Sequence, residues 1–197
     1  MGMLPKSYEG QDCSLARALE VVGERWTLLV LRDAFYGVRR FTDFQVHLGV
    51  PRAVLTERLR TLVVYGLLTR QPDREQPARH QYTLTDKGWD LWPALHALRS
   101  WGEQHVPASN GPRRLFVHAI CGADIDATSS CARCHRQVSP EEVLAAPGPG
   151  LNPEVSQDPI SAALQEPHRL GQPLAVAPTR PPTERTALAD AVMGHAG

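Results

Sequence analysis

The chain has 197 residues with 21 basic and 21 acidic side chains, so its formal net charge is zero, and 42% hydrophobic residues suffice for the core of one ordinary domain. No run of 18 or more apolar residues occurs, which excludes a membrane-spanning helix, and residues 1–6 lack the apolar stretch of a signal peptide. The four cysteines are too few for a secreted disulfide framework, so we expect a reducing cytoplasm.

The first helix is expected directly after Cys13. Residues 1–12 are polar and should be loosely held, whereas apolar residues recur at helical spacing from Leu15 until Gly23 ends the helix. Cys13 would lie at the positive end of the helix dipole, where a thiolate is favoured. It is therefore a candidate redox switch, and the alternative is a small side chain packed at a helix start.

The second helix is expected over residues 24–35. Its central residues, 26–31, are apolar on every side over more than one turn, which is typical of a helix buried in the middle of a domain. Gly37 should end it.

Two short helices should follow at a sharp angle. Thr42 and Gln45 have the spacing of a capping box, which predicts a helix start stapled by Phe41. Gly49 ends this helix, and Pro51, which suits a first helical position, starts the next.

The next helix presents two different faces, and a strand pair follows it. Leu55, Leu59 and Leu62 share one face, so the opposite face is left to solvent or a partner. Residues 67–71 and 81–84 then alternate like two strands joined by a polar loop. This order of elements predicts a winged helix-turn-helix, whose second helix enters a DNA major groove.

Charge is concentrated on this segment, since residues 39–87 carry nine basic and five acidic side chains, a net charge of +4. Local Lys and Arg, rather than the overall isoelectric point, determine counterion release from DNA. The alternative is a pair of core helices with a solvated charged face. The predicted major-groove contacts are Arg52, Thr56 and Arg60, the wing contacts Arg74 and Arg79, and the phosphate contacts Arg39 and Arg40.

A long helix over residues 86–105 should follow, capped by Thr85 and kinked at Pro93. Its leucines and tryptophans form more apolar surface than a small domain covers, so we expect a second subunit to pack on it together with the first helix. A dimer would set two recognition helices about 34 Å apart, one DNA turn. The alternative is a helix folded back on its own core.

Several of these segments resemble the HxlR-type transcriptional regulators, which are bacterial winged-helix proteins similar to the MarR type. The likeness is carried in colinear order by residues 13–19 (CSLARAL), 24–33 (ERWTLLVLRD), 40–44 (RFTDF), 55–59 (LTERL), 66–68 (GLL) and 82–88 (YTLTDKG). The resemblance implies a homodimer that binds a promoter inverted repeat as a repressor or activator. It also implies a redox- or electrophile-sensing role for Cys13, because some relatives respond to quinones, aldehydes or hypochlorite through a cysteine at this place.

A Cys/His cluster follows a linker over residues 107–114. His118 and Cys121, and then Cys131 and Cys134, have the spacing of the two knuckles of a zinc ribbon. The cluster therefore predicts a structural zinc site in a hairpin over residues 115–146. A redox-active pair at Cys131 and Cys134, or plain packing of thiols, are the alternatives.

Residues 145–197 contain nine prolines, almost no aromatic residues and no sustained periodicity. This composition predicts a mostly disordered tail from residue 147 onward, with a short helix possible over residues 181–193.

The sequence thus predicts a mainly α protein with a small β-wing, namely a winged helix-turn-helix domain over residues 13–106, the Cys/His hairpin and the Pro-rich tail. The predicted function is sequence-specific binding of double-stranded DNA by a homodimeric regulator, with a small-molecule or oxidant effector. The alternative is a metal- or thiol-responsive protein-interaction module on the same scaffold. An enzyme is not expected, because no phosphate loop, paired carboxylates or nucleophile motif occurs.

Overall fold

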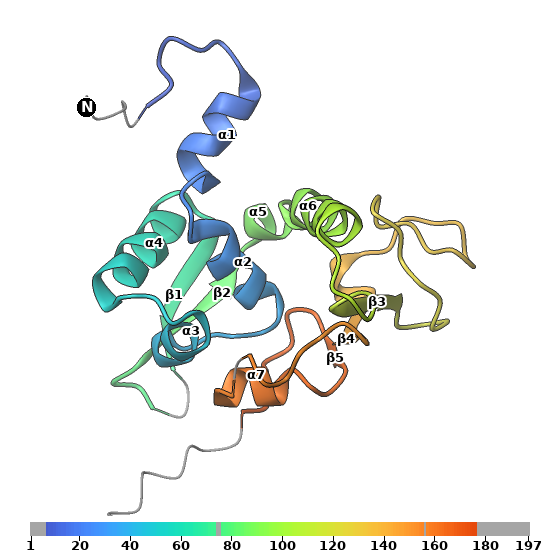
Figure 1. Ribbon diagram of the computed structural model, residues 1–197. Coiled ribbons are helices and arrows are strands. Elements are labelled where there is room, and N and C mark those ends of the chain that lie inside the picture. The colour runs from blue at the N-terminus through green and yellow to red at the C-terminus, as the bar shows by residue number, and fades with distance from the viewer. Residues whose placement is uncertain (1–6, 74–75, 156, 177–197) are drawn as a thin grey trace, which may run out of the picture.

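The structure is a computed structural model that describes residues 7–73, 76–155 and 157–176. It is mostly helical, with a two-stranded and a three-stranded antiparallel sheet (Figure 1). No helix in this part of the chain combines the length and apolar character needed to span a bilayer. The predicted helix over residues 181–193 lies outside the described residues.

Helix α2 (Thr27–Phe35) is at the centre of the winged-helix region, as predicted. Val30, Leu31 and Phe35 on this helix have no exposed surface. The helix starts later than residue 24 because residues 24–26 form a turn, in which the Thr27 N–H donates to the Glu24 carbonyl (2.9 Å). Its central position fixes the elements that carry the candidate DNA-binding side chains.

Helices α3 (Phe41–Leu48) and α4 (Arg52–Val64) form the predicted helix-turn-helix. Gly49 ends α3 in the left-handed conformation (φ +60°), which glycine adopts without a steric penalty. The predicted capping box is wrong, because Arg40 occupies the N-cap position and the Thr42 hydroxyl lies 3.1 Å from the Asp43 carboxylate. Pro51 is the N-cap residue of α4 rather than its first helical residue.

Strands β1 (Leu68–Pro72) and β2 (His80–Leu84) form the wing. They pair antiparallel with Leu68 opposite Leu84, and the hydroxyls of Thr69 and Thr83 lie 2.7 Å apart. The Tyr82 N–H donates to the Arg39 carbonyl (2.8 Å), so the wing is joined to the segment before α3.

The expected long helix is two helices, α5 (Asp86–Trp89) and α6 (Trp92–His105). Thr85 caps α5 as predicted, because its hydroxyl oxygen accepts the Gly88 N–H (3.0 Å). Pro93 lies in the first turn of α6, where its missing N–H costs no intrahelical hydrogen bond, so the predicted kink is instead a break before the proline.

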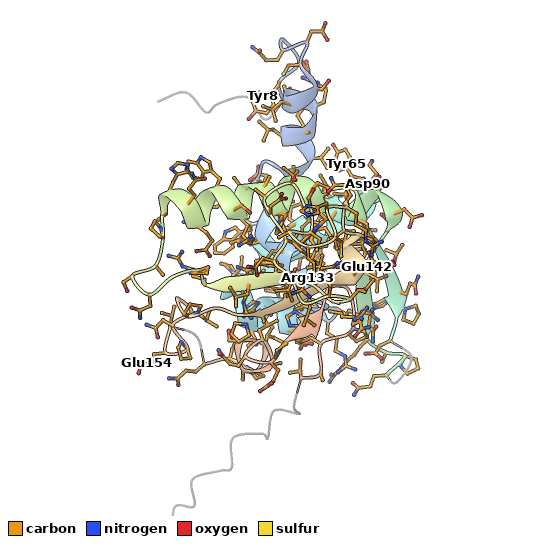
Figure 2. The ribbon with its side chains drawn as sticks, turned by 90° about the vertical axis from the view of Figure 1, so that its right-hand side faces the viewer. Tyr8, Tyr65, Asp90, Arg133, Glu142 and Glu154 are labelled. Atoms are coloured by element: carbon orange, nitrogen blue, oxygen red, sulfur yellow. The ribbon has the colours of Figure 1, made fainter. Side chains whose placement is uncertain are left out.

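Helix α1 (Ser14–Val22) stands away from the rest of the molecule in both views (Figures 1 and 2). None of its residues is buried, and Leu15 is 66% exposed. On α6, Trp92 and His96 are buried in the chain's own core, whereas Leu98 and Trp101 are more than half exposed. Two apolar helix faces are therefore left uncovered by the described residues of this chain.

The C-terminal extension, residues 106–176, has more structure than the sequence predicts. Strands β3 (Arg114–His118), β4 (Val143–Pro147) and β5 (His168–Arg169) form one sheet in that order, with a 3-10 turn, η1 (Pro140–Glu142), before β4. Helix α7 (Pro159–Ala163) packs near α3. The expected disorder is therefore wrong for residues 147–155 and 157–176, among which Ile160, Leu164 and Leu170 are buried.

Candidate nucleic-acid interface and cysteine cluster

A cleft of about 610 Å³ separates one face of α4, along its whole length, from the wing. Its walls carry most of the predicted DNA contacts. The polar lining residues are Arg40, Thr42, Arg52, Thr56, Arg60, Arg70, Arg79 and His80, and the apolar ones Phe41, Leu59, Val63, Val64 and Tyr82. Arg74, predicted on the wing, lies outside the described residues.

Arg52 and Thr56 lie one turn apart on the exposed face of α4. The Arg52 guanidinium lies 4.8 Å from the centre of the Phe41 ring, and this cation–π contact holds it at the start of the helix. The Thr56 hydroxyl donates to the Arg52 carbonyl (2.8 Å), so its oxygen remains able to accept a further hydrogen bond.

Arg60 lies further along the exposed face of α4 and already has a partner in this chain. It donates to Glu57 through two nitrogens, at 2.8 and 3.1 Å. This contact raises the pKa of Arg60. Both side chains are exposed, so the pair contributes little to stability.

The two predicted phosphate contacts, Arg39 and Arg40, also have partners within the molecule. Arg40 forms an ion pair with the buried carboxylate of Asp73 (2.9 Å) and so holds the wing. Arg39 donates to the Gly171 carbonyl (3.0 Å) and so holds the end of the extension. Arg79, in contrast, is exposed on the wing.

Arg70 lines the cleft but was not among the predicted contacts. It stands opposite Tyr82 in the sheet, and its Nη2 lies 3.1 Å from His80 Nδ1. The alternation of side chains along a strand could have identified Arg70 from the sequence, because it follows the buried Leu68 by two residues and therefore lies on the same face of the wing.

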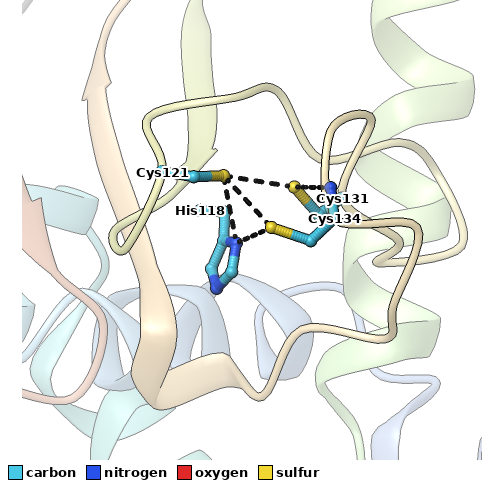
Figure 3. Close-up of side chains that lie close together, drawn as sticks. All are labelled: His118, Cys121, Cys131 and Cys134. Atoms are coloured by element: carbon cyan, nitrogen blue, oxygen red, sulfur yellow. Dashed lines mark hydrogen bonds between the residues drawn. The ribbon is translucent and has the colours of Figure 1, made fainter.

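The predicted Cys/His cluster is brought together in the extension (Figure 3). The ligand atoms of His118, Cys121, Cys131 and Cys134 all lie within 4.8 Å of one another. Cys121 Sγ is 3.5 Å from both other sulfurs, and His118 Nδ1 is 3.3 Å from Cys121 Sγ and 3.5 Å from Cys134 Sγ. Four thiolates around Zn²⁺ at ~2.3 Å would lie roughly 3.8 Å apart, so the four side chains have the spacing of a tetrahedral site.

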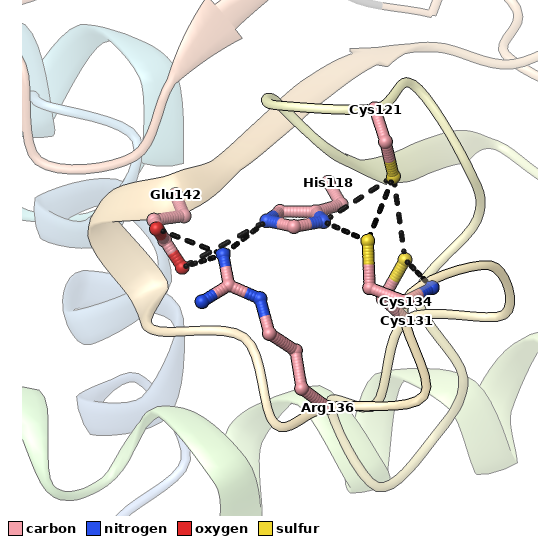
Figure 4. Close-up of polar contacts among 6 residues, drawn as sticks. All are labelled: His118, Cys121, Cys131, Cys134, Arg136 and Glu142. Carbon is pink, nitrogen blue, oxygen red and sulfur yellow. Dashed lines mark hydrogen bonds and ion pairs between the residues drawn. The ribbon is translucent and has the colours of Figure 1, made fainter.

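The other nitrogen of His118 faces a carboxylate and a guanidinium (Figure 4). His118 Nε2 lies 3.8 Å from Glu142 and 3.1 Å from Arg136, and Arg136 in turn pairs with Glu142 at 3.2 Å. A histidine that binds a metal through one nitrogen commonly donates through the other to a carboxylate, which fixes its ring. In this arrangement Glu142 is beyond hydrogen-bond distance of the ring, and the Arg136 guanidinium, which can only donate, contacts Nε2 instead.

The thiols of the cluster differ in acidity. The Cys134 backbone N–H donates to Cys131 Sγ (3.3 Å) and lowers the pKa of the Cys131 thiol to about 6, so this sulfur is largely ionised at neutral pH. The contact with the Cys121 side chain raises the pKa of Cys134 to about 11. The cluster therefore contains at least one thiolate, the form in which cysteine binds metals or reacts with oxidants.

Residues 21–110 match the family model described as HxlR-like helix-turn-helix. An uncharacterized HTH-type transcriptional regulator of Mycobacterium tuberculosis is 43% identical over 153 residues, covering 78% of this chain and 96% of that protein. The chain belongs to the HxlR-like helix-turn-helix family.

Other relatives agree with this family membership. YvaP, an uncharacterized HTH-type transcriptional regulator of Bacillus subtilis, is 32% identical over 94 residues, covering 47% of this chain and 87% of that protein. The crystal structure of PA1607, described as a transcription factor, superposes with a TM-score of 0.57 at 34% identity, covering 68% of this chain and 94% of that one. The HxlR-like chain is thus a transcriptional regulator of the helix-turn-helix type and not an enzyme.

The likeness extends beyond the helix-turn-helix. A matched span of 153 residues within a chain of 197 must include residues 45 to 153, and hence the Cys/His cluster. The mycobacterial relative therefore has counterparts of the wing and of the extension as far as residue 153.

Cys13, the other predicted reactive residue, lies far from this cluster in the sequence. It is exposed and occupies the N-cap position of α1, where its side chain makes no capping hydrogen bond. An exposed thiol at a helix N-terminus is accessible to oxidants.

Proposed function

We propose that this HxlR-like regulator binds a short inverted repeat in a promoter as a homodimer and controls the neighbouring gene. The observation that supports the proposal is the exposed face of α4. On this face Arg52, Thr56 and Arg60 line the cleft opposite the wing. Arg52 and Thr56 suit base edges, and Arg79 of the wing suits the adjacent phosphates. Arg39 and Arg40 would contact phosphate only by exchanging their present partners.

Selection of bound sequences from a random DNA pool is the direct test. We expect a palindromic motif whose half-sites lie about one DNA turn apart, with an affinity that falls as salt rises. A pool that yields no enriched motif would contradict sequence-specific binding.

The groove assignment is tested by a gel shift with the double variant Arg52→Ala/Thr56→Ala. We expect at least a tenfold loss of affinity, because each specific base contact is worth about 1–3 kcal/mol. Arg113→Ala is the matched control, since Arg113 is exposed and precedes β3 on the far side of the molecule from α4 (Figure 1). Unchanged binding by the double variant would refute the groove assignment.

Dimerisation is supported by the uncovered apolar faces of α1 and α6. In a dimer, Leu15 and Leu19 of one subunit would cover surface around Leu98 and Trp101 of the other. We expect Leu15→Glu to convert a dimer into a monomer in analytical ultracentrifugation. Val155→Glu, at a position 82% exposed on the extension, should leave the mass unchanged.

We further infer that His118, Cys121, Cys131 and Cys134 hold a structural zinc ion. Their spacing and their three sulfurs with one imidazole fit the tetrahedral coordination that zinc prefers. Zinc would join β3 to the loop before β4 and so stabilise the extension.

Metal analysis of protein purified under reducing conditions tests this site. We expect one zinc per chain, its loss in Cys131→Ser, and its retention in Cys13→Ser, which removes a cysteine outside the cluster. Wild-type protein without zinc would contradict the site.

A thiol-responsive module is the second candidate function. It is favoured by the ionised Cys131 sulfur, 3.5 Å from Cys121, and by the exposure of Cys13. Mass spectrometry after mild hypochlorite should then find a Cys121–Cys131 disulfide or modified Cys13. If all four cysteines stay reduced while the protein still binds DNA, the thiol-responsive reading fails.

A further inference from the structure

A cavity of about 460 Å³ lies where the C-terminal extension meets the winged-helix region, and it shares no lining residue with the DNA-facing cleft. Arg32 of α2, Tyr36 directly after α2 and His47 of α3 form one side of it. Residues of the extension, from Ala108 to Gln165, form the other side. Cavities that bind small molecules have volumes of roughly 300–1,000 Å³ and often lie where two parts of a protein meet.

The lining of this cavity is positively charged. It includes Arg32, Arg113 and Arg114 but no acidic residue. Arg32 pairs with Asp33 (2.7 Å), and Arg113 pairs with Glu103 (3.4 Å). Among the described residues no carboxylate forms an ion pair with Arg114. The lining therefore carries one guanidinium charge that the surrounding residues do not neutralise.

Arg114 is partly buried and keeps one edge of its guanidinium free. Its Nη1 donates to the Leu164 carbonyl, and its guanidinium carbon lies 5.7 Å from the centre of the Tyr36 ring. Its Nε and Nη2 make no hydrogen bond within the described residues. Neither is among the enclosed side-chain atoms without a partner there, so a ligand can reach both. These two nitrogens form the edge through which arginine binds a carboxylate with two parallel hydrogen bonds.

The surroundings of Arg114 favour a bound anion. Burial lowers the pKa of Arg114, and the charge of Arg32 acts in the same direction. The buried carboxylate of Asp33 is already shared between Arg32 and His47, whose Nδ1 lies 2.9 Å from it. An anion that accepts from Arg114 would therefore offset both the burial of this cation and the repulsion from Arg32.

The rest of the lining indicates the body of the ligand. The apolar lining side chains are mostly aliphatic, namely Ala108, Leu151, Pro153, Val155 and Leu164. An inorganic anion would fill only a small part of the cavity and leave these side chains in contact with water. An anion with an aliphatic chain would cover them as well as neutralise Arg114.

We propose that this cavity binds a small aliphatic carboxylate. The carboxylate accepts hydrogen bonds from Nε and Nη2 of Arg114, and the aliphatic chain lies against Leu151, Pro153 and Leu164. Because residues of α2 and α3 form part of the lining, the bound ligand strengthens the attachment of the extension to the helix-turn-helix. Its role as an effector rests on the proposed regulatory function, whereas its binding does not.

Calorimetric titration of the full-length protein tests the ligand class. The probes are octanoate, its uncharged counterpart octanamide, and acetate, which has the carboxylate without the chain. We expect one octanoate per chain, bound at least tenfold more tightly than either of the others, because each lacks one of the two contacts. Equal affinity for octanoate and octanamide, equal affinity for octanoate and acetate, or no saturable binding of octanoate would overturn the proposal.

Variants then assign the carboxylate contact. Arg114→Met should weaken octanoate binding about tenfold or more, and Arg114→Lys, which keeps the charge but loses the two-bond edge, should weaken it less. Arg169→Met is the matched control, because Arg169 is an exposed arginine of the extension that does not line the cavity. Unchanged octanoate affinity in Arg114→Met would overturn the assignment.

Two features keep the outcomes separate. The comparison of octanoate with octanamide uses wild-type protein, so it stands if an Arg114 variant fails to fold. All titrations are made without DNA, whereas the gel shifts described above are made without octanoate. Failure of one set of measurements therefore leaves the conclusion from the other unaffected.

Discussion

The winged-helix region (residues 13–105) and the C-terminal extension (residues 106–176) are held together by different contacts. In the first, leucines of α4 and the aliphatic residues of α2 pack between helices that are close in sequence. In the second, strands pair across long loops, and the chain returns to α2, where Gly171 N–H donates to the Phe35 carbonyl (2.7 Å).

This difference indicates that the extension depends on the winged-helix region for its stability. The extension combines a few large buried residues such as Ile160 with small ones such as Ala145, a thiol cluster and contacts to α2. We therefore expect the extension to need the winged-helix core for its folding. The following predictions test that dependence.

Phe35→Ala should have the largest effect, because Phe35 belongs to the part of the core that both regions contact. It is fully buried, lies 5.3 Å from the ring centres of both Trp89 and Trp92, and accepts from Gly171 through its carbonyl. Large-to-small changes at such sites cost about 3–5 kcal/mol. Urea unfolding should show this loss, and hydrogen exchange should show the extension losing protection together with α2.

Val64→Ala is the matched control, since Val64 is 69% exposed on the same region and its truncation should cost about 0.5 kcal/mol or less. If Phe35→Ala left exchange in β3 and β4 unchanged, the extension would be independent of the winged-helix core.

Most of the winged-helix region could be predicted from sequence because its signals are local. Leu55, Leu59 and Leu62 repeat at helical spacing and are all buried, and Gly49 ends α3 where predicted. The details that were predicted wrongly depend on which of several neighbouring residues begins a helix. Thr42 has capping-box spacing, but the N-cap residue is Arg40, two residues earlier, so the Thr42 hydroxyl lies inside the first turn.

The extension could be predicted only at its cysteines, whose spacing is a local pattern. Residues 147–176 have a composition typical of disorder, yet Ile160 and Leu170 are buried because partners distant in the sequence cover them. Such contacts leave no periodicity in the sequence. A cavity of about 240 Å³ lined by residues of α2, α6 and β3 could not be predicted either, because its walls come from three separate elements.

The pH dependence of stability should reveal the second link between the regions, from His96 of α6 to the Asp126 carbonyl. Burial lowers the pKa of folded His96 from 6.5 to about 4, so the unfolded state binds the proton more tightly. The contribution of the neutral ring is therefore complete above pH ~6.5 and is lost as pH falls toward about 4. The difference corresponds to at most about 3 kcal/mol.

The measurement is urea unfolding between pH 4 and pH 8 for wild type and His96→Gln, which keeps a donor for Asp126. The variant should lose part of the pH dependence, whereas His105→Gln, at an exposed histidine of the same helix, should retain it. Identical pH profiles for wild type and His96→Gln would show that the ring is not protected from protonation by burial.

Gly37→Ala should have a smaller effect, at the point where the extension lies against the turn after α2. Gly37 has φ +86°, and a Cβ there would lie 1.7 Å from the Gln172 carbonyl oxygen. Gly49→Ala is the control, because Gly49 also has positive φ (+60°) but no atom within 4 Å of a Cβ. Both substitutions should lower the free energy of unfolding by about 1 kcal/mol because of the left-handed conformation, and only Gly37→Ala should lower it further.

The extra cost at Gly37 should appear as local detachment. Trypsin cleavage after Arg169, which is exposed on β5, should become faster in Gly37→Ala and stay at the wild-type rate in Gly49→Ala. Equal cleavage rates in the two variants would mean that residues 171–174 do not pack on Gly37.

Arg39→Met should have the smallest effect on stability, and it separates two roles for this side chain. If Arg39 mainly holds the Gly171 carbonyl, its loss should cost about 1 kcal/mol and speed tryptic cleavage after Arg169 roughly fivefold, while the salt dependence of DNA binding stays the same. Arg79→Met should have the opposite effects, because Arg79 is exposed on the wing. The rate of cleavage after Arg169 should be unchanged, and the slope of DNA affinity against salt concentration should become smaller by about one. A reduced salt slope in Arg39→Met would instead assign Arg39 to a phosphate, and the contact with Gly171 would then be one that DNA displaces.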